Sequence, residues 1–209
     1  MTEPTQDAGR VQRWRTLELP WRGVDRLGEA LELRMSEPRD AVAWVEHLQR
    51  ITTETPWMLQ SDEDPLPTAG EQRGLIEEYG IRAGSVAICA VRPGEKGILG
   101  TITLASGRSR RTEHVAELSM GVAKHAWGRG IGRLLMDAAL THALASRIVK
   151  RVSLSVFHDN EVARRLYERV GFATEGVLRR YVRMGTHHED LVVMGIWLED
   201  EAPTAGGLA

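Results

Sequence analysis

The chain has little cysteine and no long apolar run. These two shortages exclude disulfide-rich and membrane-spanning proteins. Cys89 is the one cysteine among 209 residues, so no disulfide can form within a single chain, and a reducing compartment is the natural setting. No apolar run approaches the roughly 20 residues that span a bilayer, and the polar N-terminus contains no signal-peptide core. The sequence predicts a soluble, cytoplasmic, globular protein with no membrane partner.

An excess of either charge is also missing. The 27 basic and 29 acidic side chains give a formal net charge of −2. A general nucleic-acid binder would normally be distinctly basic. We therefore expect no nucleic-acid partner.

The order of apolar patterns indicates one folded domain, which we place at residues 29–198. An N-terminal extension (1–28) precedes it and a flexible C-terminal tail (199–209) follows it. Alternating runs predict strands, and runs with helical spacing predict helices. Strands are expected near 31–35, 85–91, 98–105, 115–122, 152–156, 174–183 and 189–198, with helices from Asp40, over 72–79, after Gly132 and after Asn160. The fold class is therefore α/β (α+β), with a single mixed, mostly antiparallel sheet of about seven strands and helices on both faces.

Two of these helices have predicted buried faces. The helix from Asp40 is expected to bury an apolar stripe, and the helix capped by Asp159 or Asn160 should end at Gly171. The first stripe comprises Val42, Val45, Leu48 and Ile51; the second comprises Val162, Ala163, Leu166, Tyr167 and Val170.

The most specific local feature is a glycine-rich turn between a strand and a helix. The sequence Trp-Gly-Arg-Gly-Ile-Gly occupies residues 127–132, and the helical apolar spacing begins at Ile131. Glycines let the backbone approach a ligand, and the free N–H groups of a helix N-terminus favour an anion. A dinucleotide fingerprint needs Gly-x-Gly-x-x-Gly in the first βα unit, whereas here Gly-x-Gly-x-Gly occurs late in the chain. A Walker loop needs Gly-Lys-Ser/Thr, whereas Gly132 is followed by Arg133 and Leu134. The turn predicts a phosphate site of another kind.

These residues, together with a second block, resemble the GCN5-related N-acetyltransferase (GNAT) superfamily. Its cofactor signature, Arg/Gln-x-x-Gly-x-Gly/Ala, falls on residues 127–132, with Trp127 where arginine or glutamine is usual. The second block is Asn-x-x-Ala-x-x-x-Tyr-x-x-x-Gly-Phe, present as Asn160, Ala163, Tyr167, Gly171 and Phe172. Glu175 to Arg179 looks most like the ribosomal-protein-alanine and small-amine branch. The resemblance implies the acyl-CoA N-acyltransferase fold over roughly 31–198.

The resemblance also implies a donor and its binding residues. The donor would be acetyl-CoA as co-substrate, without a metal, and the acceptor a primary amine of a small molecule or a protein N-terminus. The residues implied for the cofactor are Met120, Val122, Trp127, Gly128, Arg129, Gly130, Ile131, Gly132 and Asn160. Asn160 either contacts the cofactor amide or serves as a plain helix cap.

Two side chains are candidates for proton transfer. Tyr167 is implied as the general acid, because a phenol near pKa 10 can protonate a thiolate whose thiol has a pKa of about 8.5; it could instead be only a core aromatic. Glu117, an acid on the strand that enters the cofactor turn, could accept the proton of the amine through water. It could equally be a solvated or salt-bridged strand residue. His125 and His158 are expected to be surface histidines.

The remaining charged clusters have less specific interpretations. The sequence His187-His188-Glu189-Asp190 predicts a turn rather than a metal site, because adjacent strand residues point to opposite faces. Arg108, Arg110 and Arg111 could attract a 3′-phosphate or form a solvated loop. The segments 55–59 and 62–64 lie where the family lines its acceptor pocket, and they would recognise a cationic amine or form a mobile lid.

Three hypotheses follow for the whole chain. The first is an acetyl-CoA-dependent N-acetyltransferase that moves the acetyl group directly to an amine. The alternatives are a catalytically silent acyl-CoA-binding module and a nucleotide-binding protein. The acceptor and a homodimer are left open.

Overall fold

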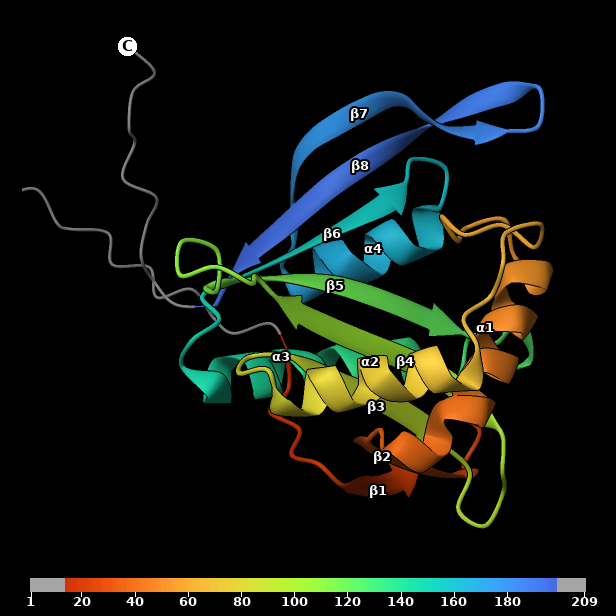
Figure 1. The fold of residues 1–209 in the computed structure, drawn as a ribbon, viewed down its shortest axis with the longest axis vertical. Helices are drawn as coiled ribbons and strands as arrows, with labels where there is room; N and C mark the ends of the chain where they lie inside the picture. Colours follow the sequence, from red (N-terminus) through yellow and green to blue (C-terminus); the bar gives the residue numbers. More distant parts are fainter. Residues whose placement is uncertain (1–13, 199–209) are drawn as a thin grey trace, which may run out of the picture.

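A computed structural model describes residues 14–198 and shows a single sheet flanked by helices (Figure 1). The strands are β1 (Trp21–Val24), β2 (Ala30–Met35), β3 (Val86–Val91), β4 (Ile98–Ser106), β5 (Val115–Val122), β6 (Arg151–Phe157), β7 (Ala173–Met184) and β8 (His187–Trp197). The helices are α1 (Ala41–Glu54), α2 (Ala69–Ile81), α3 (Ile131–Ser146) and α4 (Glu161–Val170), with short 3₁₀ turns at Pro38–Asp40 and Lys124–Ala126. None of the helices within 14–198 is long and apolar enough to cross a bilayer.

The sheet order is β1-β2-β3-β4-β5-β6-β8-β7, and only the β5–β6 pair is parallel. The predicted fold class, a mixed and mostly antiparallel sheet, is confirmed. The sheet has eight strands rather than about seven. The additional strand is β1, inside the segment 1–28 that we expected as an extension, where Trp14 and Leu17 also join the core. The division of the chain at residues 28 and 198 stays a prediction.

Helices cover both faces because the central strands are apolar on both sides. In β3, Ile88 and Ala90 pack into the core that contains α3 and α4, whereas Ala87 and Cys89 pack beneath α1 and α2. This two-sided burial explains why β3 reads as a continuous apolar run.

Two predicted helix faces are corrected. In α1 the buried residues are Ala41, Trp44, His47, Ile51 and Thr52, while Val42 is 57% exposed. Trp44 can be buried because its indole N–H donates to Ser36 Oγ over 3.0 Å. In α4, Tyr167 and Val170 are buried as predicted, but Val162 is 82% exposed.

Candidate active site

A gap opens in the sheet where β5 and β6 separate. The two strands pair only over Val115–Glu117 and Arg151–Ser153. Beyond Glu117 the strands diverge, as Figure 1 shows. Strand β5 remains paired with β4 over this stretch, up to Gly100 and Val122. One edge of the second half of β5 therefore faces the gap.

The register identifies which backbone groups line this edge. The N–H of Ala123 donates to the carbonyl of Leu99 over 2.9 Å. Because hydrogen-bonded pairs alternate along an antiparallel ladder, the N–H and C=O groups of Met120 and Val122 point away from β4 and into the gap. The carbonyl of Val122 accepts the indole N–H of Trp127 over 2.7 Å. An extended ligand could hydrogen-bond to this edge as an added strand would.

The glycine turn lies at the open end of the gap. Gly128 and Gly130 have φ values of 75° and 84°, a left-handed conformation that glycine adopts without strain. Gly130 is the N-cap of the 16-residue helix α3. Among residues 14–198, no hydrogen bond takes up the five consecutive backbone N–H groups of residues 128–132. Five free donors at a helix N-terminus fit a diphosphate.

Trp127, the residue that departs from the motif, uses both its backbone N–H and its indole N–H in hydrogen bonds within the protein. Its backbone N–H donates to the carbonyl of Lys124 over 3.1 Å, and its side chain is 47% exposed. The indole hydrogen bond to Val122 ties the turn to the end of β5. Trp127 therefore stabilises the connection between strand and turn.

Tyr167 and Asn160 lie on α4, which follows β6. Tyr167 is 7% exposed and packs against Phe172, with ring centroids 5.9 Å apart. Burial raises the pKa of the Tyr167 hydroxyl to about 12, so the phenol keeps its proton at neutral pH. Asn160 caps the helix, because its Oδ1 accepts the N–H of Ala163 over 3.2 Å. The capping role of Asn160 is thus visible in the structure.

Glu117 lies at the closed end of the gap. It is exposed and sits in register with Ser153 of β6. It lies five residues before Val122 on the strand, about 17 Å along an extended chain. Any proton transfer between Glu117 and an amine near Val122 would therefore need a chain of several water molecules.

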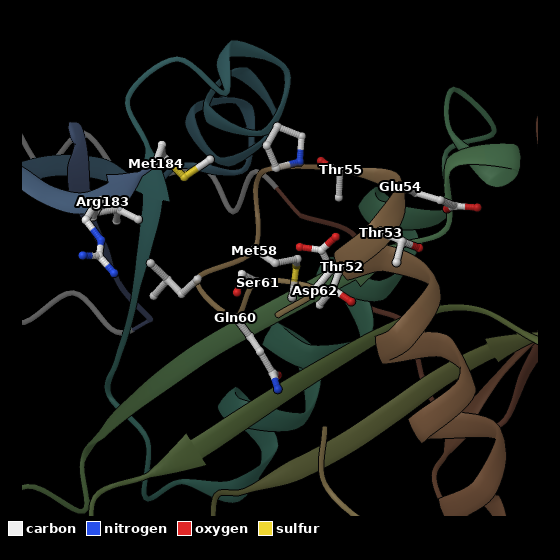
Figure 2. Close-up of a pocket in the computed structure, with 13 residues that line it drawn as sticks. Thr52, Thr53, Glu54, Thr55, Met58, Gln60, Ser61, Asp62, Arg183 and Met184 are labelled. Atoms are coloured by element: carbon white, nitrogen blue, oxygen red, sulfur yellow. The ribbon is translucent and has the colours of Figure 1, made fainter. Parts of the chain in front are cut away.

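Beside the open end of the gap is a cavity of about 370 Å³. Its walls are the end of α1 with the following loop and the far end of β7 (Figure 2). The lining residues are Thr52, Thr53, Glu54, Thr55, Pro56, Met58, Leu59, Gln60, Ser61, Asp62, Val182, Arg183 and Met184. The predicted acceptor segments 55–59 and 62–64 therefore both contribute, although Asp64 only bonds to Ser61 within the loop.

Two contacts join the wall of the cavity to the strands that border the gap. Glu54 at the end of α1 accepts the backbone N–H of Lys124, just after β5, over 2.7 Å. Trp57 of the loop packs edge-on against Phe157 at the end of β6, with centroids 5.8 Å apart. The loop after α1 is thus attached to both strands that border the gap.

Two residues near the gap, His47 and Glu54, were not among the candidates drawn from the sequence. His47 is 1% exposed, and its Nε2 lies 3.3 Å from the carbonyl of Gly121. Burial lowers the pKa of His47 to about 4, so the imidazole is neutral at pH 7. Helix α1 lies close to β5 at Gly121, because a Cβ there would lie 2.5 Å from Ile51 Cδ1 and would displace that methyl group.

The other charged clusters form local ion pairs. His187 contacts Glu189 over 3.1 Å on the β7–β8 hairpin, and residues 14–198 contain no group of three or more side chains that could hold a metal ion. His158 and Asp159 pair at an exposed turn. Arg108 pairs with Glu78 of α2.

Two N-acetyltransferases of known sequence are similar to this chain. The chain is 28% identical over 106 residues to the uncharacterised N-acetyltransferase YoaA of Bacillus subtilis (strain 168), which covers 51% of this chain and 56% of YoaA. The chain thus spans little more than half of that relative. It is 25% identical over 175 residues to YdaF of the same organism, named as a ribosomal N-acetyltransferase, covering 80% of this chain and 91% of YdaF.

Solved structures show the same fold. A GNAT-family acetyltransferase from Streptococcus pneumoniae superimposes with a TM-score of 0.76 at 27% identity, covering 81% of this chain and 99% of that one. The acetyltransferase yncA of Salmonella typhimurium, solved with its cofactor acetyl-CoA, gives 0.72 at 19% identity, covering 84% and 98%. The model of the Acetyltransferase (GNAT) family matches residues 44–172, which include the gap, the glycine turn and Tyr167. The chain belongs to the GNAT acetyltransferase family.

Proposed function

We propose that this protein transfers an acetyl group from acetyl-CoA directly to a primary amine. The observation that carries the proposal is the run of five free backbone N–H groups at residues 128–132, at the end of the free β5 edge. This combination fits a diphosphate joined to an extended arm with amide groups, which is the chemistry of coenzyme A.

The chain's own residues would share the work of acyl transfer. The backbone N–H of Val122 points into the gap and would polarise the thioester carbonyl. Tyr167, kept protonated by burial, would donate its proton to the thiolate leaving group. Glu117 is our proposed proton acceptor for the amine, acting through water. Acetyl-CoA supplies the activated acetyl group. Asn160 would donate to an amide of the cofactor through its side-chain nitrogen, which the helix cap does not use.

The acceptor would enter through the cavity beside β7. Its walls carry the carboxylates of Glu54 and Asp62 and the guanidinium of Arg183, so we infer a polar acceptor that carries a primary amine, either a small molecule or a protein N-terminus. A cytoplasmic setting is our inference from the buried, unpaired Cys89.

The test is thiol release from acetyl-CoA, measured on a panel of small amines and N-terminal peptides. The proposal predicts turnover that depends on one acceptor class and yields the N-acetylated product. Tight coenzyme A binding without turnover on any acceptor would instead support a silent acyl-CoA-binding module. Displacement of acetyl-CoA by ATP or NAD would contradict the site assignment.

A further inference from the structure

The turn between β1 and β2 (residues 25–29) packs directly against the glycine turn, although a hundred residues separate them. The N–H of Arg26 donates to the carbonyl of Arg129 over 3.1 Å. The Arg129 guanidinium lies 2.5 Å from a Glu29 oxygen and 3.4 Å from an Asp25 oxygen. The β1–β2 turn therefore forms part of the surroundings of residues 128–132.

The β1–β2 turn is held rigidly by Asp25. The side chain of Asp25 is fully buried and accepts the N–H groups of Leu27 and Glu29 over 2.9 and 3.1 Å. Arg92, on the neighbouring hairpin, donates to the same carboxylate over 2.7 Å. This hydrogen bond from Arg92 is the main reason that the pKa of Asp25 falls to about 2. Asp25 and Glu29 thus engage both Arg92 and Arg129, so two carboxylates already offset the charge of the Arg129 guanidinium.

Arg26 differs from these two arginines. Its side chain is exposed and passes over Gly130, since a Cβ built on Gly130 would lie 3.2 Å from Arg26 Nε and 3.3 Å from its Cγ. Among the described residues 14–198, no carboxylate pairs with its guanidinium. A cation beside the positive end of the α3 dipole is unfavourable unless an anion lies between them.

We propose that Arg26 is a coenzyme A-binding residue whose guanidinium binds the diphosphate held by residues 128–132. The proposal rests on acetyl-CoA being the donor, and it adds a ligand from outside the matched family region 44–172. A guanidinium can bind two phosphate oxygens at once, which complements the single hydrogen bonds of the backbone N–H groups. The β1–β2 turn then positions this cation through Asp25.

The experiment compares Arg26→Gln and Arg26→Lys with the control Arg73→Gln. Arg73 is an exposed arginine on α2, which covers the other face of the sheet. Dissociation constants are measured by calorimetry for coenzyme A, for dephospho-coenzyme A and for S-acetylpantetheine, which has no diphosphate. Thermal melting checks that each variant is folded.

We expect Arg26→Gln to weaken coenzyme A binding about fivefold or more, with Arg26→Lys in between and Arg73→Gln unchanged. The loss should persist with dephospho-coenzyme A and vanish with S-acetylpantetheine. Binding of coenzyme A within twofold of wild type would overturn the proposal. An equal loss with S-acetylpantetheine, or a loss confined to the 3′-phosphorylated ligand, would also overturn it. If the wild-type protein bound no coenzyme A, the proposed function itself would fail. If the wild type bound coenzyme A and Arg26→Gln bound it equally well, only the role of Arg26 would fail.

Discussion

Tyr167 is a nearly buried phenol whose pKa of about 12 keeps it neutral over the whole working range of pH. A phenol with an ordinary pKa near 10 is already protonated at pH 7, and burial makes its proton harder to release. At the residue scale, the proposed acid role therefore depends on how closely the hydroxyl of Tyr167 approaches the leaving thiolate, which mutation can test.

Tyr167→Phe should lower kcat about 100-fold or more, because the thiolate would lose its proton donor. The affinity for coenzyme A, measured by calorimetry, should stay within twofold, since the ring contact with Phe172 is retained. Unchanged kcat in the phenylalanine variant would remove Tyr167 from the mechanism.

Glu117→Gln tests the proposed base. We expect kcat/KM to fall at least about tenfold, because glutamine cannot accept a proton from the amine. Glu77→Gln, another exposed glutamate but on α2, is the matched control and should have wild-type kinetics. Equal kinetics for both variants would exclude Glu117 and turn attention to Glu54, which lines the acceptor cavity.

His47 should make the stability of the protein depend on pH. Its folded-state pKa of about 4 lies below the ordinary histidine value of 6.5, so folding favours the neutral imidazole. This contribution is complete above pH 6.5 and is lost as pH falls towards 4, at a cost of at most about 3 kcal/mol. Urea unfolding of wild type and His47→Gln between pH 7 and 5 checks this, because the variant should show the shallower decline. Parallel declines would show that His47 is not responsible.

At the scale of elements, the sequence predicts where strands and helices lie better than which way they face. Periodicity alone placed α1 and α4 correctly, but aliphatic residues were expected at the buried positions. Trp44 and His47 are buried instead of Val42, because Ser36 accepts the indole N–H of Trp44 and the Gly121 carbonyl is a partner for Nε2 of His47. Such partners come from other elements and leave no mark on local spacing. The contact of Arg129 with Asp25 was likewise invisible in the sequence.

The glycine turn makes an element-scale prediction with a matched control. Gly128 and Gly94 have φ values of 75° and 83°, and a Cβ added at either position would meet no surrounding atom within 4 Å. Alanine at either position should therefore lower the free energy of unfolding by a similar amount, about 1 kcal/mol.

Only Gly128→Ala should also weaken coenzyme A binding, by about tenfold, because the added methyl group projects from the diphosphate turn. Urea denaturation measures the stability of both variants, and calorimetry measures binding. Equal coenzyme A affinity for the two variants would contradict the position of the diphosphate.

At the scale of the whole molecule, the sheet combines a continuous core with a local break. Strands β1 to β5 and β6 to β8 are connected within the sheet only through three residue pairs of β5 and β6, and the core of α3 and α4 spans both parts. The split exposes one edge of β5 without dividing the domain. The resemblance predicted this fold correctly, while the eighth strand at Trp21–Val24 followed from no periodic signal, since it is short and contains Gly23.

The reactivity of Cys89 can test whether this core opens locally. It is fully buried on the central strand β3, and burial raises the pKa of its thiol to about 11. The native protein should therefore react with a thiol reagent only when the domain unfolds globally. The labelling rate, followed through a urea titration, should track global unfolding. Rapid labelling in native buffer would show that the sheet opens locally around β3.

Binding of acetyl-CoA along the free edge of β5 underlies every proposed role in the site, and amide hydrogen exchange can detect it residue by residue. Saturating acetyl-CoA should slow exchange at Met120, Val122 and residues 128–132, whose N–H groups have no partner in the described protein. Exchange in the already paired strand β3 should not change. Binding that leaves β5 and the glycine turn unprotected, or that protects another surface, would contradict this position of the donor.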